Sequence, residues 1–217
     1  NASAARPHIR RLEEEKLDRF RGTWVKTFGL DLSKSQLAYL AHKICLMEDV
    51  AEGRLATPIE TMLLRLLASH SLKGESLDIL EIGTLFGVSA ASLYALRAPQ
   101  DRSVSLTLID PMEGYYGRSV RDPITGVEIV EEVLRRNLAR LGVPDESWRL
   151  IKHLSTDKEA IEEANTKAYD MVIIDGDHSV EGVARDYELY GKMVKPEGVL
   201  IFDDYGNPDW PGIKPYV

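Results

Sequence analysis

Apolar residues recur every three or four positions through the first third of the chain, which is the spacing of helices with one buried face. One such stripe includes Leu17, Phe20 and Trp24, and a second runs through residues 37–47. A third stretch opens with residues 57–60, Thr-Pro-Ile-Glu, which predict a capping box with the Thr at the N-cap and the Glu at N3. Residues 1–74 are therefore expected to form a helical layer that serves as a cap, a lid or a dimerisation segment.

After residue 74 short apolar runs alternate with helical patterns. Runs that are apolar at every position indicate strands covered on both faces, as in a parallel sheet. The predicted fold class is therefore α/β: a Rossmann-like, doubly wound, mostly parallel sheet over residues 75–217, behind an N-terminal helical layer. The predicted strands are 77–81, 105–109, 149–153, 171–174 and 199–202, and the predicted helices are 88–97, 128–141, 157–166 and 181–194.

Charge and cysteine usage narrow the classes of partner. The 27 Lys and Arg residues against 35 Asp and Glu residues give a net charge of −8, which disfavours nucleic-acid binding. No apolar run approaches the roughly 18 residues that span a bilayer, so no membrane partner is expected. The single cysteine, Cys45, cannot form an internal disulfide, and the cytoplasm is the expected location.

The first strand of the predicted sheet leads into a glycine-containing turn, Glu81-Ile82-Gly83, with Gly87 four residues later. This spacing differs from the dinucleotide motif G-x-G-x-x-G, and a carboxylate here would repel a pyrophosphate, so an NAD-linked oxidoreductase is disfavoured. A cationic ligand such as S-adenosylmethionine suits the turn, although a plain strand-to-helix turn fits it equally well. Asp110, which ends the second strand, is interpreted as a ribose ligand, with a turn residue as the alternative.

Carboxylates also follow the fourth and fifth predicted strands. Asp175 follows one strand, and Asp203 and Asp204 follow the other, so the three side chains are expected to converge. An all-oxygen ligand set favours a hard ion such as Mg²⁺, and turn formation or helix capping is the alternative for each residue alone. His178 lies near the same place and is the candidate general base, because histidine titrates near neutral pH.

These motifs, in this order, resemble class I S-adenosylmethionine-dependent methyltransferases over residues 55–217. The resemblance is to the metal-dependent small-molecule O-methyltransferases, which include the catechol, caffeoyl-CoA and macrolide-sugar types. It implies three sets of site residues. Cofactor contacts would come from Thr57, Glu81, Gly83, Ser89, Asp110, Thr156 (adenine pocket) and Asp177; metal ligands from Asp175, Asp203 and Asp204; and the catalytic base would be His178.

Two departures from the catechol and caffeoyl-CoA types favour the sugar and natural-product branch. Asp204 stands where those types have Asn, and His178 stands where they have a catalytic Lys. The resemblance therefore implies methyl transfer to a hydroxyl of a small molecule in natural-product biosynthesis, with S-adenosylmethionine and a divalent metal, expected to be Mg²⁺. A catechol-like phenol acceptor is the first alternative. A non-catalytic cofactor-binding partner protein is the second.

Two further expectations concern the edges of the site. The Gly- and Tyr-rich segment 111–127 is long for a strand-to-helix connection and would form a flap or a surface insertion. Related methyltransferases close the sheet with a hairpin after the fifth strand, whereas this sequence ends at residue 217, a short distance after Asp203 and Asp204. Either C-terminal strands are missing or another chain covers the sheet edge. A homo-oligomer through the N-terminal helices is a further expectation.

Overall fold

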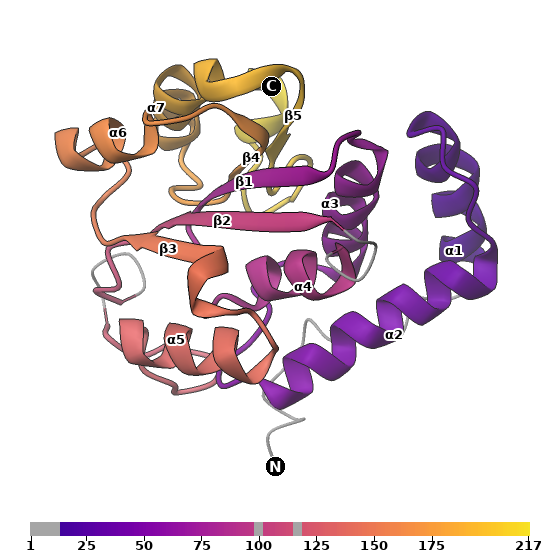
Figure 1. Cartoon of the computed structure of the whole chain (residues 1–217), viewed down its shortest axis with the longest axis horizontal. Helices are drawn as coiled ribbons and strands as arrows, with labels where there is room; N and C mark the ends of the chain where they lie inside the picture. The colour runs from indigo at the N-terminus through magenta and orange to yellow at the C-terminus, as the bar shows by residue number, and fades with distance from the viewer. Residues whose placement is uncertain (1–13, 98–101, 115–118) are drawn as a thin grey trace.

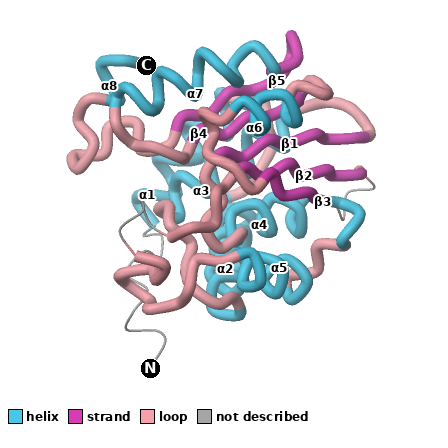
Figure 2. Tube along the Cα trace, turned by 90° about the vertical axis from the view of Figure 1, so that its left-hand side faces the viewer, coloured by secondary structure: helices cyan, strands magenta, loops and turns pink. Residues whose placement is uncertain are grey.

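The computed structural model describes residues 14–97, 102–114 and 119–217, and within them one five-stranded sheet forms the centre of the molecule (Figure 1). All neighbouring strands are parallel, and Figure 2 shows their order running from β5 to β3. The α/β, Rossmann-like doubly wound fold is therefore confirmed. The order is β3-β2-β1-β4-β5, with β1 at Ser76–Ile82, β2 at Ser103–Ile109, β3 at Trp148–Ile151, β4 at Tyr169–Ile174 and β5 at Val194–Phe202.

Helices cover both faces of this sheet, with α6 and α7 on one side and α4 and α5 on the other (Figure 1). The four helices predicted between the strands are confirmed within a few residues at their ends. The N-terminal layer is α1 (Glu14–Phe20), η2 (Arg21–Val25), α2 (Lys34–Val50) and α3 (Ile59–Ser71). The others are α4 (Val88–Arg97), α5 (Glu131–Arg140), η4 (Asp145–Ser147), α6 (Lys158–Ala164), α7 (Val180–Tyr190), η5 (Gly191–Met193) and α8 (Ile213–Tyr216).

Alternation along the strands divides the apolar core between the two faces. Ile79 and Ile173 belong to the larger cluster, together with residues of α3, α4 and α5. Leu80 and Val172 belong to the second cluster, which is completed by residues of α6 and α7. Successive side chains of a strand point to opposite faces. Glu81, two positions after Ile79, therefore faces the α3 and α4 side of the sheet.

The N-terminal helices are part of the same core. Phe20, Leu37 and Ile44 are buried and join the cluster that contains Ile173. The predicted stripes of apolar residues are confirmed at Leu17, Phe20 and residues 37–47, whereas Trp24 is 38% exposed and does not join the core. Ile9 and Leu12 lie outside the described residues. Among the helices of the described segments, none is long and apolar enough to cross a membrane.

The capping box expected at residues 57–60 is wrong. The α3 helix takes Pro58 as its N-cap and has no side-chain cap. The Thr57 hydroxyl instead donates a hydrogen bond to Asp203 at 3.2 Å, and Glu60 pairs with Lys16. A hydrogen bond that the Thr57 hydroxyl donates to a buried carboxylate is stronger than one that it would accept from a neutral backbone N–H. The Thr57 side chain is therefore turned toward the sheet. A capping box does form at α2, between Ser33 and Gln36.

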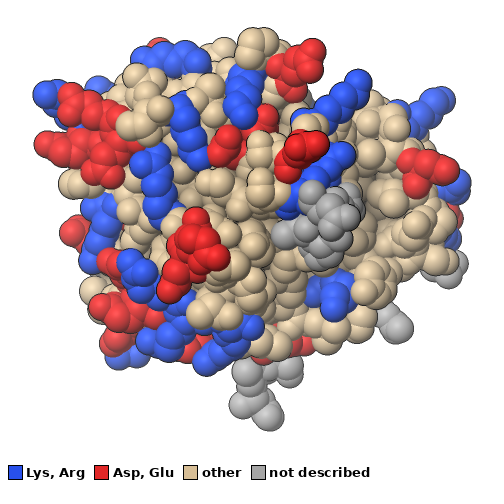
Figure 3. All heavy atoms as spheres, in the orientation of Figure 1, with Lys and Arg blue, Asp and Glu red and all other residues tan. Residues whose placement is uncertain are grey.

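The surface carries both signs of charge. On the face seen in Figure 3, Lys and Arg side chains are interspersed with Asp and Glu, and neither sign forms a continuous patch on that face. Such mixing is typical of a solvated surface. The expectation that no nucleic acid is bound stays a prediction.

Backbone pairing aligns the ends of four strands at one edge of the sheet. The residue after each of β1, β2, β4 and β5 donates its N–H to the carbonyl of the last residue of a neighbouring strand, over 2.9–3.2 Å. The sheet ladder therefore continues one residue beyond the strands and fixes these residues at one level. They are Gly83, Asp110, Asp175 and Asp203.

At Gly83 two chain segments pass very close together. Gly83 has a φ of +80°, and a Cβ at this position would lie 2.2 Å from the carbonyl oxygen of Asp175. Only glycine permits both this conformation and this approach. The close approach brings the turn after β1 against the turn after β4.

We expect Gly83→Ala to lower the free energy of unfolding by at least about 3 kcal/mol, because strain at positive φ adds to a steric clash with backbone. Gly142→Ala is the matched control, since Gly142 has a φ of +83° and open space around it. It should lose only about 1–2 kcal/mol. Urea denaturation of both variants measures the difference. Equal losses in the free energy of unfolding would show that the close approach to Asp175 does not add to the cost of the substitution.

Beneath the turn after β4 lies a buried carboxylate, Asp186 of α7. Its side chain is 1% exposed, and Oδ2 has no hydrogen-bond partner among the described residues. Burial raises the pKa of Asp186 to about 6, although a hydrogen bond with Ser155 opposes the shift. The folded protein therefore holds a proton here more tightly than the unfolded chain does.

The raised pKa of Asp186 predicts that this residue makes the free energy of unfolding depend on pH. The folded state is favoured while Asp186 is protonated, and this stability is lost as pH rises from about 4 to about 6. Relative to wild type, Asp186→Asn should gain stability over that range, by up to about 3 kcal/mol for a shift of two pKa units. Urea denaturation at pH 4, 5, 6 and 7 measures it, with exposed Asp209→Asn as the control. A difference between Asp186→Asn and wild type that does not change with pH would contradict the prediction.

Candidate functional site

The candidate site lies where the strand order reverses, between the carboxyl ends of β1 and β4. Open α/β sheets bind their ligands at this topological switch point. A cavity is present there, lined by side chains from the turn after β1, from the segment that precedes α3 and from the end of β4. The predicted site residues among its lining are Thr57, Glu81, Gly83, Ser89 and Asp175. The structure therefore brings five of the predicted residues together.

A buried arginine that sequence reasoning missed occupies the centre of this cluster. Arg65 of α3 is fully buried, and its Nη1 donates to the Ser89 hydroxyl at 2.9 Å and to Glu81 Oε1 at 3.3 Å. Its Nη2 contacts Asp175 Oδ2 at 2.7 Å and Asp203 Oδ1 at 3.0 Å. One guanidinium thus bridges carboxylates from β1, β4 and β5. A single charged residue inside the apolar run 62–67 was the signal that could have identified it.

Burial and mutual repulsion set the protonation behaviour of this cluster. Burial raises the pKa of Glu81, and contacts with Arg65, Ser89 and Thr84 oppose the shift. Burial and the neighbouring Asp203 raise the pKa of Asp175 well above its usual range, against the opposing effect of Arg65. Burial lowers the pKa of Arg65, but Asp203, Asp175 and Glu81 together raise it more, so the guanidinium stays charged. One cation therefore faces three carboxylates, and the cluster favours further positive charge.

His178 lies beside this cluster, in the turn between β4 and α7. Its Nδ1 contacts Asp204 Oδ2, and its Nε2 lies 3.8 Å from Asp175 Oδ1. The imidazole stacks on Trp210 with ring centroids 5.2 Å apart. Although burial raises the pKa of Asp204, hydrogen bonds from His178 and Asn207 outweigh it and leave that pKa below its usual value. Asp204 thus holds the ring from one side and Trp210 from its face.

Asp110 organises two loops at the neighbouring strand end. Its Oδ2 accepts the backbone N–H groups of Thr84 and Leu85, at 3.1 and 2.9 Å, and its Oδ1 accepts that of Met112 at 2.9 Å. Leu85 and Met112 both have positive φ, a conformation that costs energy for residues other than glycine. Asp110 therefore stabilises the strained turn after β1 as well as the one after β2. Its predicted role as a ribose ligand stays a prediction.

Thr156 and Asp177 lie away from the cavity. Thr156 is exposed in the turn between β3 and α6. Asp177 is exposed after β4, and its Oδ1 accepts the backbone N–H of Ser179. Neither residue is among those that line the cavity. Their predicted contacts with the adenine and with the amino acid end of the cofactor stay predictions.

The segment after β2 is anchored beside the cavity by a buried ion pair. Arg54 Nη2 lies 3.1 Å from Asp122 Oδ1, both side chains are almost fully buried, and Arg54 also lines the cavity. Asp122 additionally accepts hydrogen bonds from Thr125. The tip of the expected flap, Tyr115 to Gly117, lies outside the described residues, so its role as a flap stays a prediction.

The predicted metal ligands are only partly assembled. Asp175 and Asp203 meet on Nη2 of Arg65, whereas Asp204 is turned to His178. Across the described part of the chain, no group of three His, Cys, Asp or Glu side chains is arranged to hold an ion. The donor chemistry nevertheless fits a hard divalent cation, because three carboxylates follow adjacent strands and the cluster carries excess negative charge. In this structure Asp204 Oδ2 contacts His178 and its Oδ1 accepts a hydrogen bond from Asn207, so Asp204 does not join the other two acids at Arg65.

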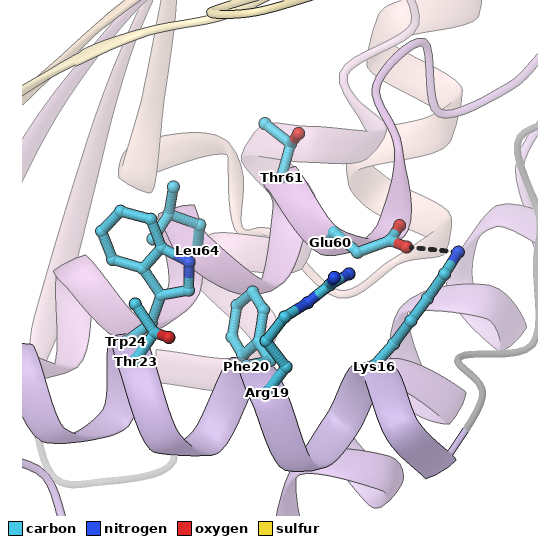
Figure 4. Close-up of a pocket in the computed structure, with 8 residues that line it drawn as sticks. All are labelled: Lys16, Arg19, Phe20, Thr23, Trp24, Glu60, Thr61 and Leu64. Atoms are coloured by element: carbon cyan, nitrogen blue, oxygen red, sulfur yellow. Dashed lines mark hydrogen bonds and ion pairs between the residues drawn. The ribbon is translucent and has the colours of Figure 1, made fainter.

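A larger hollow lies on the flank of α3 that faces α1 and η2. Figure 4 shows Phe20, Trp24 and Leu64 along it, with Lys16 bound to Glu60 at one end. Its volume is about 400 Å³. None of the predicted site residues lines this hollow, so it belongs to the N-terminal layer.

Comparisons with known proteins identify the family. A family model described as a methyltransferase domain matches residues 80–205, which is more than half of the chain. An uncharacterized protein of Acanthamoeba polyphaga mimivirus is 29% identical over 152 residues. That alignment covers 69% of this chain and 61% of the relative, so the chain spans less than two thirds of the relative's length.

Two solved structures are similar to the chain over most of its length. The methyltransferase PaMTH1 of Podospora anserina, solved with bound S-adenosylhomocysteine, is 16% identical, with coverage of 94% and 83% of the two chains and a TM-score of 0.48. CalS11, a TDP-rhamnose 3′-O-methyltransferase of calicheamicin biosynthesis, is 17% identical, with coverage of 94% and 81% and a TM-score of 0.49. On the family match, the chain belongs to the methyltransferase-domain family, which confirms the methyltransferase identity that the resemblance implied.

Proposed function

We propose that this methyltransferase transfers the methyl group of S-adenosylmethionine to a hydroxyl of a small molecule, with His178 as the base. The observation that carries the proposal is the juxtaposition at the carboxyl edge of the sheet. Glu81, Gly83 and Ser89 surround the cavity at the switch point, and the pair of His178 and Asp204 lies next to it. Cofactor and acceptor positions would thus adjoin each other.

The cavity supports cofactor binding through charge and shape. Glu81 supplies buried negative charge for the ammonium and sulfonium groups of the methyl donor. Gly83 and Thr57 line the same cavity. Asp110 is at the level of Gly83 on the neighbouring strand, the position from which an acid reaches a ribose.

The hydrogen bond between His178 and Asp204 supports the role of base. When Nδ1–H is donated to Asp204, a neutral imidazole carries its lone pair on Nε2, the nitrogen that faces Asp175. A carboxylate that holds Nδ1 also stabilises the imidazolium once the proton has been taken. Stacking on Trp210 fixes the plane of the ring. Proton transfer from an acceptor hydroxyl to Nε2 is therefore the step assigned to His178.

Asp175, Asp203 and Asp204 are the residues proposed to hold a divalent cation, with Mg²⁺ as the expected ion. Bound there, such an ion would lower the pKa of the acceptor hydroxyl. The acceptor is proposed to be a sugar or another natural-product alcohol, for which both His178 and the carboxylates would be needed. A catechol-like phenol, which is more acidic, is the alternative acceptor.

The proposal is tested with His178→Gln, which keeps a polar side chain but cannot take up a proton. Methyl transfer from radiolabelled S-adenosylmethionine is measured against methyl glycosides, a sugar nucleotide and catechol, each with Mg²⁺ or EDTA. We expect turnover to fall at least about 100-fold, the scale of a lost general base, while S-adenosylhomocysteine binding is unchanged. His153→Gln is the matched control, because His153 is half exposed beside Asp157 and lies outside the cluster.

Each arm of this experiment addresses one part of the proposal. Full activity of His178→Gln would contradict the role of base, and activity in EDTA would contradict metal dependence. Transfer to catechol alone would replace the sugar acceptor with the phenol. Absence of transfer to every acceptor, together with tight S-adenosylhomocysteine binding, would favour a non-catalytic binding partner.

A further inference from the structure

Arg65 touches both halves of the proposed site. Its Nη1 reaches Glu81 and Ser89, and its Nη2 reaches Asp175 and Asp203. The guanidinium is planar, so these two sets of contacts lie in one fork with a fixed geometry. A single buried side chain therefore links the carboxylate proposed for the cofactor to two carboxylates proposed for the metal.

The contacts of Nη2 are significant because they occupy one oxygen on each of two proposed metal ligands. Asp175 Oδ2 and Asp203 Oδ1 each already accept from a cation, at 2.7 and 3.0 Å. Asp203 Oδ1 also accepts from the Thr57 hydroxyl. Arg65 is 0% exposed, so solvent screens its charge at this pair less than it would at the surface.

We propose that Arg65 is an internal counter-ion that competes with a divalent cation for Asp175 and Asp203 and thereby limits the affinity of the metal site. The inference rests on the proposed function, in that Asp175 and Asp203 are taken as metal ligands. Arg65 contacts carboxylates rather than reacting atoms, so it is a positioning residue. Its charge keeps the two acids paired before any ligand binds.

The sign of this effect follows from electrostatics. A divalent cation at Asp175 and Asp203 would lie close to the guanidinium, and like charges in a buried site repel. Removal of the Arg65 charge should therefore tighten binding of the ion. If Arg65 instead served only to hold the acids in place, its removal would loosen the site and weaken binding. The two roles thus predict changes of opposite sign.

The test measures Mn²⁺ binding to the cofactor-free protein by electron paramagnetic resonance, with Arg65→Met as the principal variant. We expect Mn²⁺ to bind at least about tenfold more tightly, because Coulomb repulsion between a guanidinium and a divalent ion a few ångströms apart exceeds that amount even with strong screening. Arg65→Lys keeps the charge but loses the fork, so its affinity should stay within about threefold of wild type.

Arg97→Met is the matched control, because Arg97 is also buried but donates to the backbone carbonyl of Leu72. It should leave Mn²⁺ affinity unchanged. Thermal unfolding and circular dichroism establish that each variant is folded. If Arg65→Met does not fold, Arg65→Gln replaces it, since the amide can still donate to Asp175. Failure of both neutral variants to fold would make Arg65 a requirement of the fold and would overturn the tuning role.

The remaining outcomes separate this inference from the proposed function. Unchanged or weaker Mn²⁺ binding by a folded neutral variant would overturn the counter-ion role, while the wild-type site would still bind the ion. Absence of Mn²⁺ binding by wild type and every variant would contradict both the counter-ion role and the metal-dependent part of the proposed function. Cofactor binding and methyl transfer are measured separately and do not enter this test.

Discussion

The buried guanidinium of Arg65 holds carboxylates from three strands against one helix, and the arrangement of the site depends on that contact. Without a cation, Glu81 and Asp203, which are buried, and Asp175, which is 16% exposed, would be three acids facing one another. Desolvation and repulsion would then either protonate them or open the cluster. The α3 helix therefore does more than cover the sheet. It carries the positively charged Arg65, which stabilises three acidic side chains close together at the switch point.

The second constraint is the register of the parallel sheet. Because the ladder extends one residue past β1, β2, β4 and β5, four residues of the site reach the same level. Gly83 then allows the turn after β1 to pass against the carbonyl of Asp175. Asp110 holds the two strained turns beside it. Backbone geometry thus positions the side chains, and Arg65 of α3, together with Thr57 just before that helix, holds their orientation.

The fold could be predicted from the sequence because its strands are apolar on both faces and its helices are amphipathic. The residues after the strands were also predictable, since parallel topology brings their carboxyl ends together. The role of Arg65 could not be predicted, because it depends on tertiary contacts with residues that lie 16 to 138 positions away in the sequence. The role of Thr57 was misassigned for the same reason: local capping rules do not include Asp203. His178 was assigned correctly to the neighbourhood of Asp175, but its contacts with Asp204 and Trp210 required the structure.

The central claim is that the cavity between β1 and β4 binds the methyl donor. A crystal structure of the chain with S-adenosylhomocysteine tests it most directly. The ligand is predicted to place its amino acid end against Glu81 and Gly83 and its ribose toward Asp110. A ligand found instead in the hollow between α1 and α3, or bound with neither Glu81 nor Gly83 in contact, would contradict the claim.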